Sequence, residues 1–110
     1  MTIEEVGAIV FEQSTGSLTV TNDPRMNLEQ ALVPPERISV ISRHVKDGRV
    51  RDKEIFVWLV GKEKNRTDGY KIVMREDGLQ FGLASNGFPH DRYPVLAGWY
   101  GGLVSAFLSM

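Results

Sequence analysis

The chain has 110 residues, of which 42% are hydrophobic and 25% charged, with a formal net charge of −1 and no cysteine. This length fits one folded domain, residues 1–110, and the apolar content is enough to build a core, which argues against a disordered chain. The lack of cysteine excludes disulfides and thiolate metal sites and favours a reducing, cytoplasmic environment.

The first predicted elements are two strands, 6–12 and 17–21, joined by a turn at Thr15-Gly16. The alternative for the first segment is a helix, because Thr2 and Glu5 have the spacing of a capping box. Strand is the favoured prediction. The absence of Lys and Arg from residues 1–11 argues against a secretory signal peptide.

A short helix is predicted next, over residues 28–33. Asn27 can cap its start, because an asparagine side chain accepts a hydrogen bond from the first turn of a helix. Pro34-Pro35 is expected to end it, because proline cannot continue a helix.

Two hairpins are predicted in the body of the chain, because Asp-Gly at 47–48 and at 77–78 favours tight turns. The first joins 38–46 to 49–61, and the second joins 70–76 to 79–84. Two-residue loops would pair Val45 with Val50, His44 with Arg51, Ile72 with Leu83, and Met74 with Phe81. Residues 55–60 read IFVWLV and are apolar on both faces, so this strand needs cover on two sides.

A C-terminal helix is predicted over residues 94–110, with six apolar residues on one face and a ridge of small residues beside it. The apolar residues are Val95, Leu96, Trp99, Leu103, Phe107 and Met110, and the ridge is Gly98, Gly102 and Ala106. The expected fold class is therefore α+β, mainly antiparallel sheet with this helix packed on it. The segment is too short and too rich in glycine for a membrane span.

The only candidate catalytic pair is His90 and Asp91, with His90 as a general base and Asp91 as the acid that orients it. The two residues are adjacent in the sequence, whereas catalysis requires their side chains to be adjacent in space. A hydrolase centred on this pair is the weakest of three functional hypotheses, because neighbours in an extended chain point apart. Two histidines without cysteine make a structural zinc site improbable. No catalytic residue, metal or other cofactor is therefore expected.

The basic residues are concentrated in the middle of the chain: eight of the thirteen Lys and Arg residues lie between 43 and 66, with only four of the fourteen acids. The predicted hairpin 43–53 and the loop 62–66 would present this charge to phosphates. A nucleic-acid-binding module is therefore an alternative function, although the sequence pI near 6.1 is low for one.

The last third of the chain resembles the C-terminal region of small immunity proteins from bacterial contact-dependent growth inhibition systems. The resemblance rests on the Gly-Trp-Tyr-Gly pattern at 98–101 and the terminal Phe-Leu-Ser-Met. It implies a cytoplasmic protein without catalytic activity that binds one cognate toxin, often a nuclease, and neutralises it by stoichiometric occlusion. No functional residue can be transferred, because toxin-contacting positions vary between pairs.

Two sets of partner-binding residues follow for that hypothesis. Against a basic nuclease, acidic side chains would speed encounter, and aromatic or arginine anchors would supply affinity. The acidic set is Glu4, Glu5, Glu12, Asp23, Glu29 and Glu36. The second set is the hairpin tip at Asp47 with the loop residues Phe88, His90, Asp91, Arg92 and Tyr93.

Overall fold

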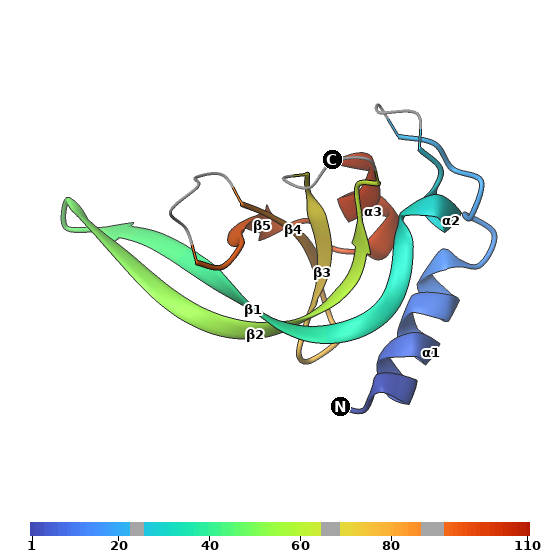
Figure 1. Ribbon diagram of the computed structural model, residues 1–110, viewed down its shortest axis with the longest axis horizontal. Helices are drawn as coiled ribbons and strands as arrows, with labels where there is room; N and C mark the ends of the chain where they lie inside the picture. The colour runs from blue at the N-terminus through green and yellow to red at the C-terminus, as the bar shows by residue number, and fades with distance from the viewer. Residues whose placement is uncertain (23–25, 65–68, 87–91) are drawn as a thin grey trace.

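The computed structural model describes residues 1–22, 26–64, 69–86 and 92–110 and shows a five-stranded closed barrel with three helices (Figure 1). The elements are α1 (Ile3–Ser14), α2 (Leu28–Ala31), β1 (Leu32–Lys46), β2 (Arg49–Lys62), β3 (Lys71–Arg75), β4 (Phe81–Ser85), β5 (Val95–Trp99) and α3 (Leu103–Leu108). Consecutive strands pair antiparallel, and β5 closes the barrel against β1 through one parallel pair, Ile41 with Val95. The predicted α+β class is confirmed.

The N-terminal segment is a helix, so the favoured strand from residue 6 and the first hairpin are wrong. Thr2 accepts a hydrogen bond from the Glu5 backbone N–H, and the Glu5 carboxylate accepts one from the Thr2 N–H. This capping box gives hydrogen-bond acceptors to two backbone N–H groups at the start of the helix, which have no partner within the helix itself. Thr15 and Gly16, where a hairpin turn was predicted, instead end the helix, with the Thr15 N–H donating to the Phe11 carbonyl.

The predicted cap of α2 is confirmed, but its predicted end is wrong. The Asn27 side chain accepts from the Gln30 N–H, and the Gln30 side chain accepts from the Asn27 N–H. The helix ends at Ala31, and Pro34-Pro35 lies inside β1, where the pairing with β2 is irregular between Leu32 and Glu36. Proline has no N–H to give to a ladder, so a sheet accommodates it at such an irregularity.

Both hairpins of the body have the predicted register. His44 pairs with Arg51 and Val45 with Val50 across the β1–β2 turn. Asp47 and Gly48 have φ of 54° and 73°, which is the left-handed geometry that two-residue hairpin loops require. Ile72 pairs with Leu83 and Met74 with Phe81 across the β3–β4 turn.

The C-terminal segment is a strand followed by a short helix, so the prediction of one helix over 94–110 is wrong. Val95, Leu96 and Trp99 belong to β5, which pairs with β4 from Ser85 to Gly82. Gly101, with φ of 81°, separates this strand from α3. The predicted packing of a C-terminal helix on the sheet is confirmed by α3, whose Leu103, Ala106 and Phe107 are buried.

Two apolar clusters hold the fold together, one on each face of the sheet. The first cluster takes residues from all five strands and none from a described helix: Val40, Val57, Val73, Ala84, Ile38, Ile55, Leu96 and Trp99. The second cluster joins Trp58, Val60 and the outward side chains of β3 and β4 to residues of α1, α2 and α3. The IFVWLV strand is therefore covered on both sides, as predicted, except that Phe56 is 51% exposed.

Gly82 is required where β4 meets β5. A Cβ atom at this position would overlap the Gly98 carbonyl oxygen and lie 2.7 Å from the Trp99 ring carbon Cε3. We expect Gly82→Ala to destabilise the protein by about 1–3 kcal/mol, because backbone cannot retreat from the added methyl group. Thermal or urea unfolding measures this effect.

Gly7→Ala is the matched control. Gly7 lies in α1, and an added Cβ would meet no atom within 4 Å. Alanine is favoured over glycine in a helix by about 1 kcal/mol, so this variant should be at least as stable as the parent. Equal destabilisation by the two substitutions would contradict the close approach at Gly82.

Candidate functional site

The hairpin β1–β2 continues well beyond the barrel (Figure 1). β2 pairs with β3 only from Val57 to Lys62, and β1 pairs with β5 only at Ile41. Residues 42–54, called the ribbon here, therefore form a two-stranded arm with no third strand among the described residues. Every residue from 43 to 54 is exposed to solvent.

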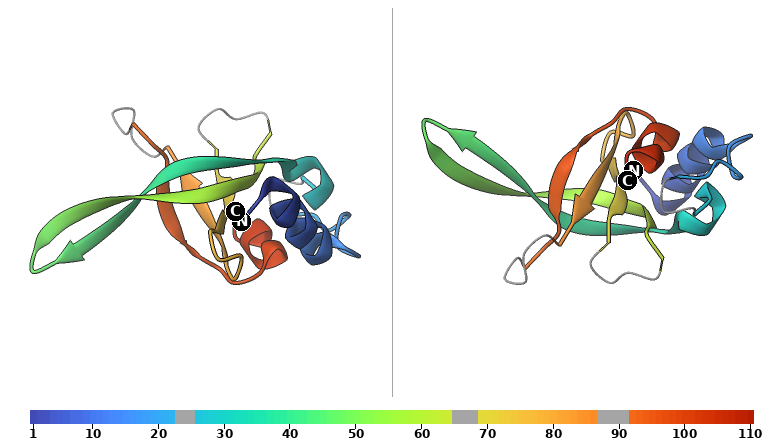
Figure 2. Two further views of the ribbon diagram at one scale, coloured as in Figure 1. Left: turned by 90° about the horizontal axis from the view of Figure 1, so that it is seen from below. Right: turned by 90° about the horizontal axis from the view of Figure 1, so that it is seen from above.

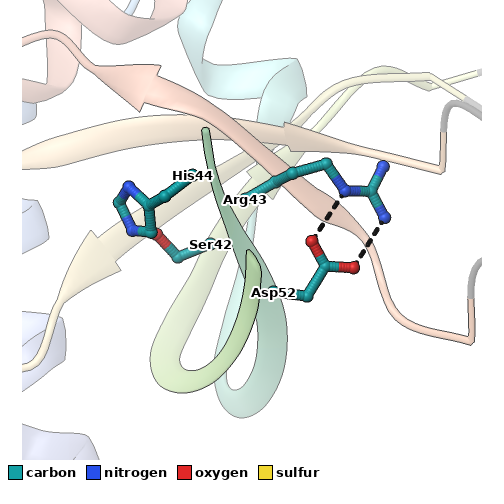
Figure 3. Close-up of polar contacts among 4 residues, drawn as sticks. All are labelled: Ser42, Arg43, His44 and Asp52. Carbon is teal, nitrogen blue, oxygen red and sulfur yellow. Dashed lines mark hydrogen bonds and ion pairs between the residues drawn. The ribbon is translucent and has the colours of Figure 1, made fainter. Parts of the chain in front are cut away.

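The register of the ribbon sorts its side chains into two faces. Residues directly opposite each other in an antiparallel ladder point to the same side, and successive residues alternate. The basic face is made by the pairs Ser42 with Lys53, His44 with Arg51, and Lys46 with Arg49. The opposite face carries Arg43 with Asp52, Val45 with Val50, and Glu54. In Figure 3, Ser42 and His44 point away from the Arg43–Asp52 pair.

On the opposite face Arg43 and Asp52 compensate each other's charge, and this pair stabilises the ribbon. Arg43 donates to both Asp52 carboxylate oxygens, from Nε at 2.8 Å and from a terminal nitrogen at 3.0 Å. These hydrogen bonds hold the pKa of the Asp52 carboxyl below its ordinary value. Val45 and Val50 pair beside them although 74% and 65% of their surface is exposed. Cross-strand ion pairs and β-branched pairs are what stabilise an isolated ladder.

The basic face carries four cations and no carboxylate. Lys46, Arg49, Arg51 and Lys53 form no ion pair with any described residue, and Lys46 lies directly opposite Arg49. Like charges placed opposite each other destabilise a sheet. This arrangement therefore opposes folding of the ribbon, and an anion bound across the face would relieve the repulsion.

Ser42 and His44 are within hydrogen-bond distance on the basic face, with Oγ 2.8 Å from Nε2. This is the reach of a nucleophile and a general base. In the described part of the chain, however, no carboxylate hydrogen-bonds His44, and the pair lies on an open strand surface that does not exclude water. The arrangement lacks the orienting group and the enclosed site that nucleophilic catalysis uses. It instead supplies polar groups that extend the basic face toward the barrel.

The helices α1 and α2, which carry most of the acidic candidate residues, lie at the other end of the molecule from the ribbon tip (Figure 2). The candidate residues are exposed on α1, on α2 and near the start of β1: Glu4, Glu5, Glu12, Glu29 and Glu36. Glu5 caps α1, and its hydrogen bonds with Thr2 lower the pKa of its carboxyl. Asp23 lies outside the described residues. The long axis of the molecule, 44 Å in extent, thus runs from an acidic helical end to a basic tip.

The described residues of the second partner-binding set lie at two separate places on the ribbon, its tip and its base. Asp47 is at the ribbon tip, whereas Arg92 and Tyr93 lie at the ribbon base, beside Pro94, whose carbonyl accepts from the Ile41 N–H at 2.8 Å. The Arg92 guanidinium is 5.3 Å from the centre of the Tyr93 ring. Phe88, His90 and Asp91 lie outside the described residues, so the structure does not place the proposed hydrolase pair.

The basic hairpin and the basic loop of the nucleic-acid hypothesis are also separated. The hairpin 43–53 contains most of the ribbon, whereas Lys62 and Lys64 lie at the opposite end of β2 from the tip. Arg66 lies outside the described residues. The ribbon alone therefore provides the candidate site, and the loop 62–66 does not extend it.

An open pocket of about 410 Å³ lies on the helix-covered side, lined by Met1, Arg37, Trp58 and Glu76. Arg37 donates to one Glu76 oxygen from Nε at 2.9 Å and from a terminal nitrogen at 2.6 Å. Its guanidinium also lies 4.5 Å from the centre of the Phe56 ring. The two charges of this pocket compensate each other, so it lacks the uncompensated charge of the basic face. No sequence pattern indicates this pocket, because its residues are distant in the chain.

Comparison with known protein families, curated sequences and solved structures finds no match to this chain. Within residues 1–22, 26–64, 69–86 and 92–110, no helix is long and apolar enough to cross a membrane. No three His, Asp or Glu side chains of these segments gather into a metal-binding group. The candidate site is therefore assigned from its geometry and charge.

The Arg43–Asp52 pair gives a measurable titration. Because the pKa of Asp52 is lowered in the folded protein, the pair is complete above the ordinary carboxyl pKa and is lost as the pH falls through the lowered value. Arg43→Gln should raise the pKa of Asp52 toward its ordinary value, as measured by carboxyl ¹³C NMR. Arg37→Gln, which removes a cation away from the ribbon, should leave it unchanged; equal shifts in both variants would contradict the assigned pairing.

Proposed function

We propose that this protein binds nucleic acid through the basic face of the β1–β2 ribbon. The observation that carries the proposal is the segregation of Lys46, Arg49, Arg51 and Lys53 on one exposed face without a carboxylate. A polyanion fits such a face, because each phosphate that a cation neutralises releases condensed counterions into solution. A cytoplasmic location, expected from the lack of cysteine, is part of this proposal.

The charge separation along the molecule supports the same function. The sequence pI of about 6.1 averages a basic arm with an acidic helical end. A phosphate backbone attracts the first and repels the second, so the protein would approach ribbon first. The low overall pI therefore does not argue against binding by the ribbon.

Salt dependence tests the number of cations engaged. Two to four phosphate contacts made by the cations of the basic face predict a slope of about −2 to −4 in a plot of log affinity against log salt concentration for a duplex. Fluorescence anisotropy with a labelled mixed-sequence duplex between 50 and 200 mM NaCl measures it. A slope near zero, or no binding at the lowest salt, would refute the proposal.

Charge removal tests which surface is used. Replacing Lys46, Arg49 and Arg51 together by Gln should weaken binding at least tenfold and make the salt slope shallower by at least about 1, because each lost phosphate contact removes about one unit. The control replaces Lys62 and Lys64 by Gln, at the other end of β2. These control substitutions should leave both quantities nearly unchanged. Equal losses in the two variants would show that the ribbon is not the contact surface.

A second candidate function is neutralisation of a cognate toxin protein, which the resemblance of the C-terminal third implies. The structural observation that favours it is the gathering of exposed acids on the helical end, where a basic nuclease would be attracted. This function predicts that a toxin domain is encoded beside the gene, and the test mixes the purified chain with that domain. Inhibition at equimolar ratio, with slower association of a Glu4→Gln, Glu12→Gln, Glu29→Gln variant, would support this function. Full toxin activity in molar excess of the chain would exclude it.

A further inference from the structure

The geometry of the ribbon points to one class of nucleic acid, and this inference rests on the proposed function. We propose that the ribbon binds B-form duplex DNA by placing its basic face in the major groove. The proposal rests on the width of the ribbon, the absence of aromatic side chains from the basic face and the donor chemistry of that face.

The size of the ribbon matches a major groove. Two paired strands lie about 5 Å apart, and the groove of B-DNA is about 12 Å wide and admits a two-stranded β-ribbon with its side chains. The basic face runs from Ser42–Lys53 to Lys46–Arg49, four residue steps or about 13 Å at strand rise. Residues 43–54 are all exposed, so no described element blocks insertion up to the base of the ribbon.

Single-stranded nucleic acid fits this face less well. Single-strand binders stack bases on aromatic side chains beside their basic residues. The basic face has none: its side chains are Ser42, His44, Lys46, Arg49, Arg51 and Lys53. The nearest aromatic residue along β2, Phe56, pairs with Ser39 and points to the opposite face, where the Arg37 guanidinium lies over its ring.

Double-stranded RNA fits less well for a geometric reason. The major groove of an A-form helix is deep and too narrow for side chains to read. A two-stranded ribbon with side chains on both faces is too wide to enter this groove and would contact only its edges. B-form DNA is therefore the duplex that the whole basic face can contact.

The donors of the basic face match one set of groove atoms. Arg49 and Arg51 carry planar guanidinium groups, and the guanine O6 and N7 acceptors lie on the floor of the major groove. Lys46 and Lys53, on the neighbouring strand and at the ribbon base, would contact the flanking phosphates. The two arginines would then distinguish duplexes by their guanine acceptors.

Three labelled ligands of one sequence test the duplex class: a 20-base-pair DNA duplex, its single strand and the corresponding RNA duplex. We expect the DNA duplex to bind at least tenfold more tightly than the other two. Equal affinity for all three would overturn this inference and leave the proposed function standing. No binding to any of them at low salt would refute both.

Base analogues test the groove. Replacing guanine by 7-deazaguanine removes only the N7 acceptor in the major groove, whereas replacing it by hypoxanthine removes the amino group in the minor groove. We expect the first change to weaken binding at least threefold and the second to have less effect. An Arg49→Ala, Arg51→Ala variant has no side-chain donor at these two positions, so the duplex binding that it retains should not discriminate 7-deazaguanine. A larger effect of hypoxanthine, or the same 7-deazaguanine loss in this variant, would overturn the groove assignment.

Discussion

One unbroken antiparallel ladder, from Glu36–Leu59 to Lys46–Arg49, joins the barrel to the ribbon. Its barrel half buries Val40 and Val57, and its outer half carries the charged faces. A slip of one residue would exchange the two faces of one strand and place Asp52 on the same face as Lys46. The buried half prevents this slip, because it would also expose the core valines. The apolar core thereby fixes the charge pattern of an arm that has no core.

The two faces of the ribbon have different physical roles. An isolated two-stranded hairpin is marginally stable in water, so the ribbon depends on its attachment to the barrel and on its own cross-strand pairs. Arg43 with Asp52 and Val45 with Val50 supply those pairs on the opposite face. The basic face contributes repulsion between its cations, apart from the hydrogen bond between Ser42 and His44. The contacts that stabilise the ribbon and the face proposed to bind nucleic acid therefore lie on different sides of the same two strands.

The errors of the sequence-based prediction have a common physical cause. Local apolar spacing did not distinguish a helix from a strand at either end of the chain. At the start, the reciprocal Thr2–Glu5 bonds decided for helix, although the strand was favoured. At the end, Leu96 and Trp99 belong to a strand because the segment pairs with β4. This pairing requires glycine at position 82, because a side chain there would collide with the backbone of β5. A long-range contact of this kind leaves no periodic signal in the sequence.

The sequence by itself determined the Asp-Gly turns, the register of both hairpins, the Asn27 cap and the concentration of cations in residues 43–66. These features depend on backbone geometry and on neighbours a few residues apart, which a chain encodes locally. Only the tertiary structure decided that the pairing of β2 with β3 stops at Val57 and that β5 pairs with β1 at Ile41 alone. Because the pairing with β3 and β5 stops at these positions, the ribbon has no neighbouring strand. The paired part of β2 also lies between the ribbon and Lys62 and Lys64. Both limits of pairing follow from how the barrel closes, which depends on contacts between segments far apart in the chain.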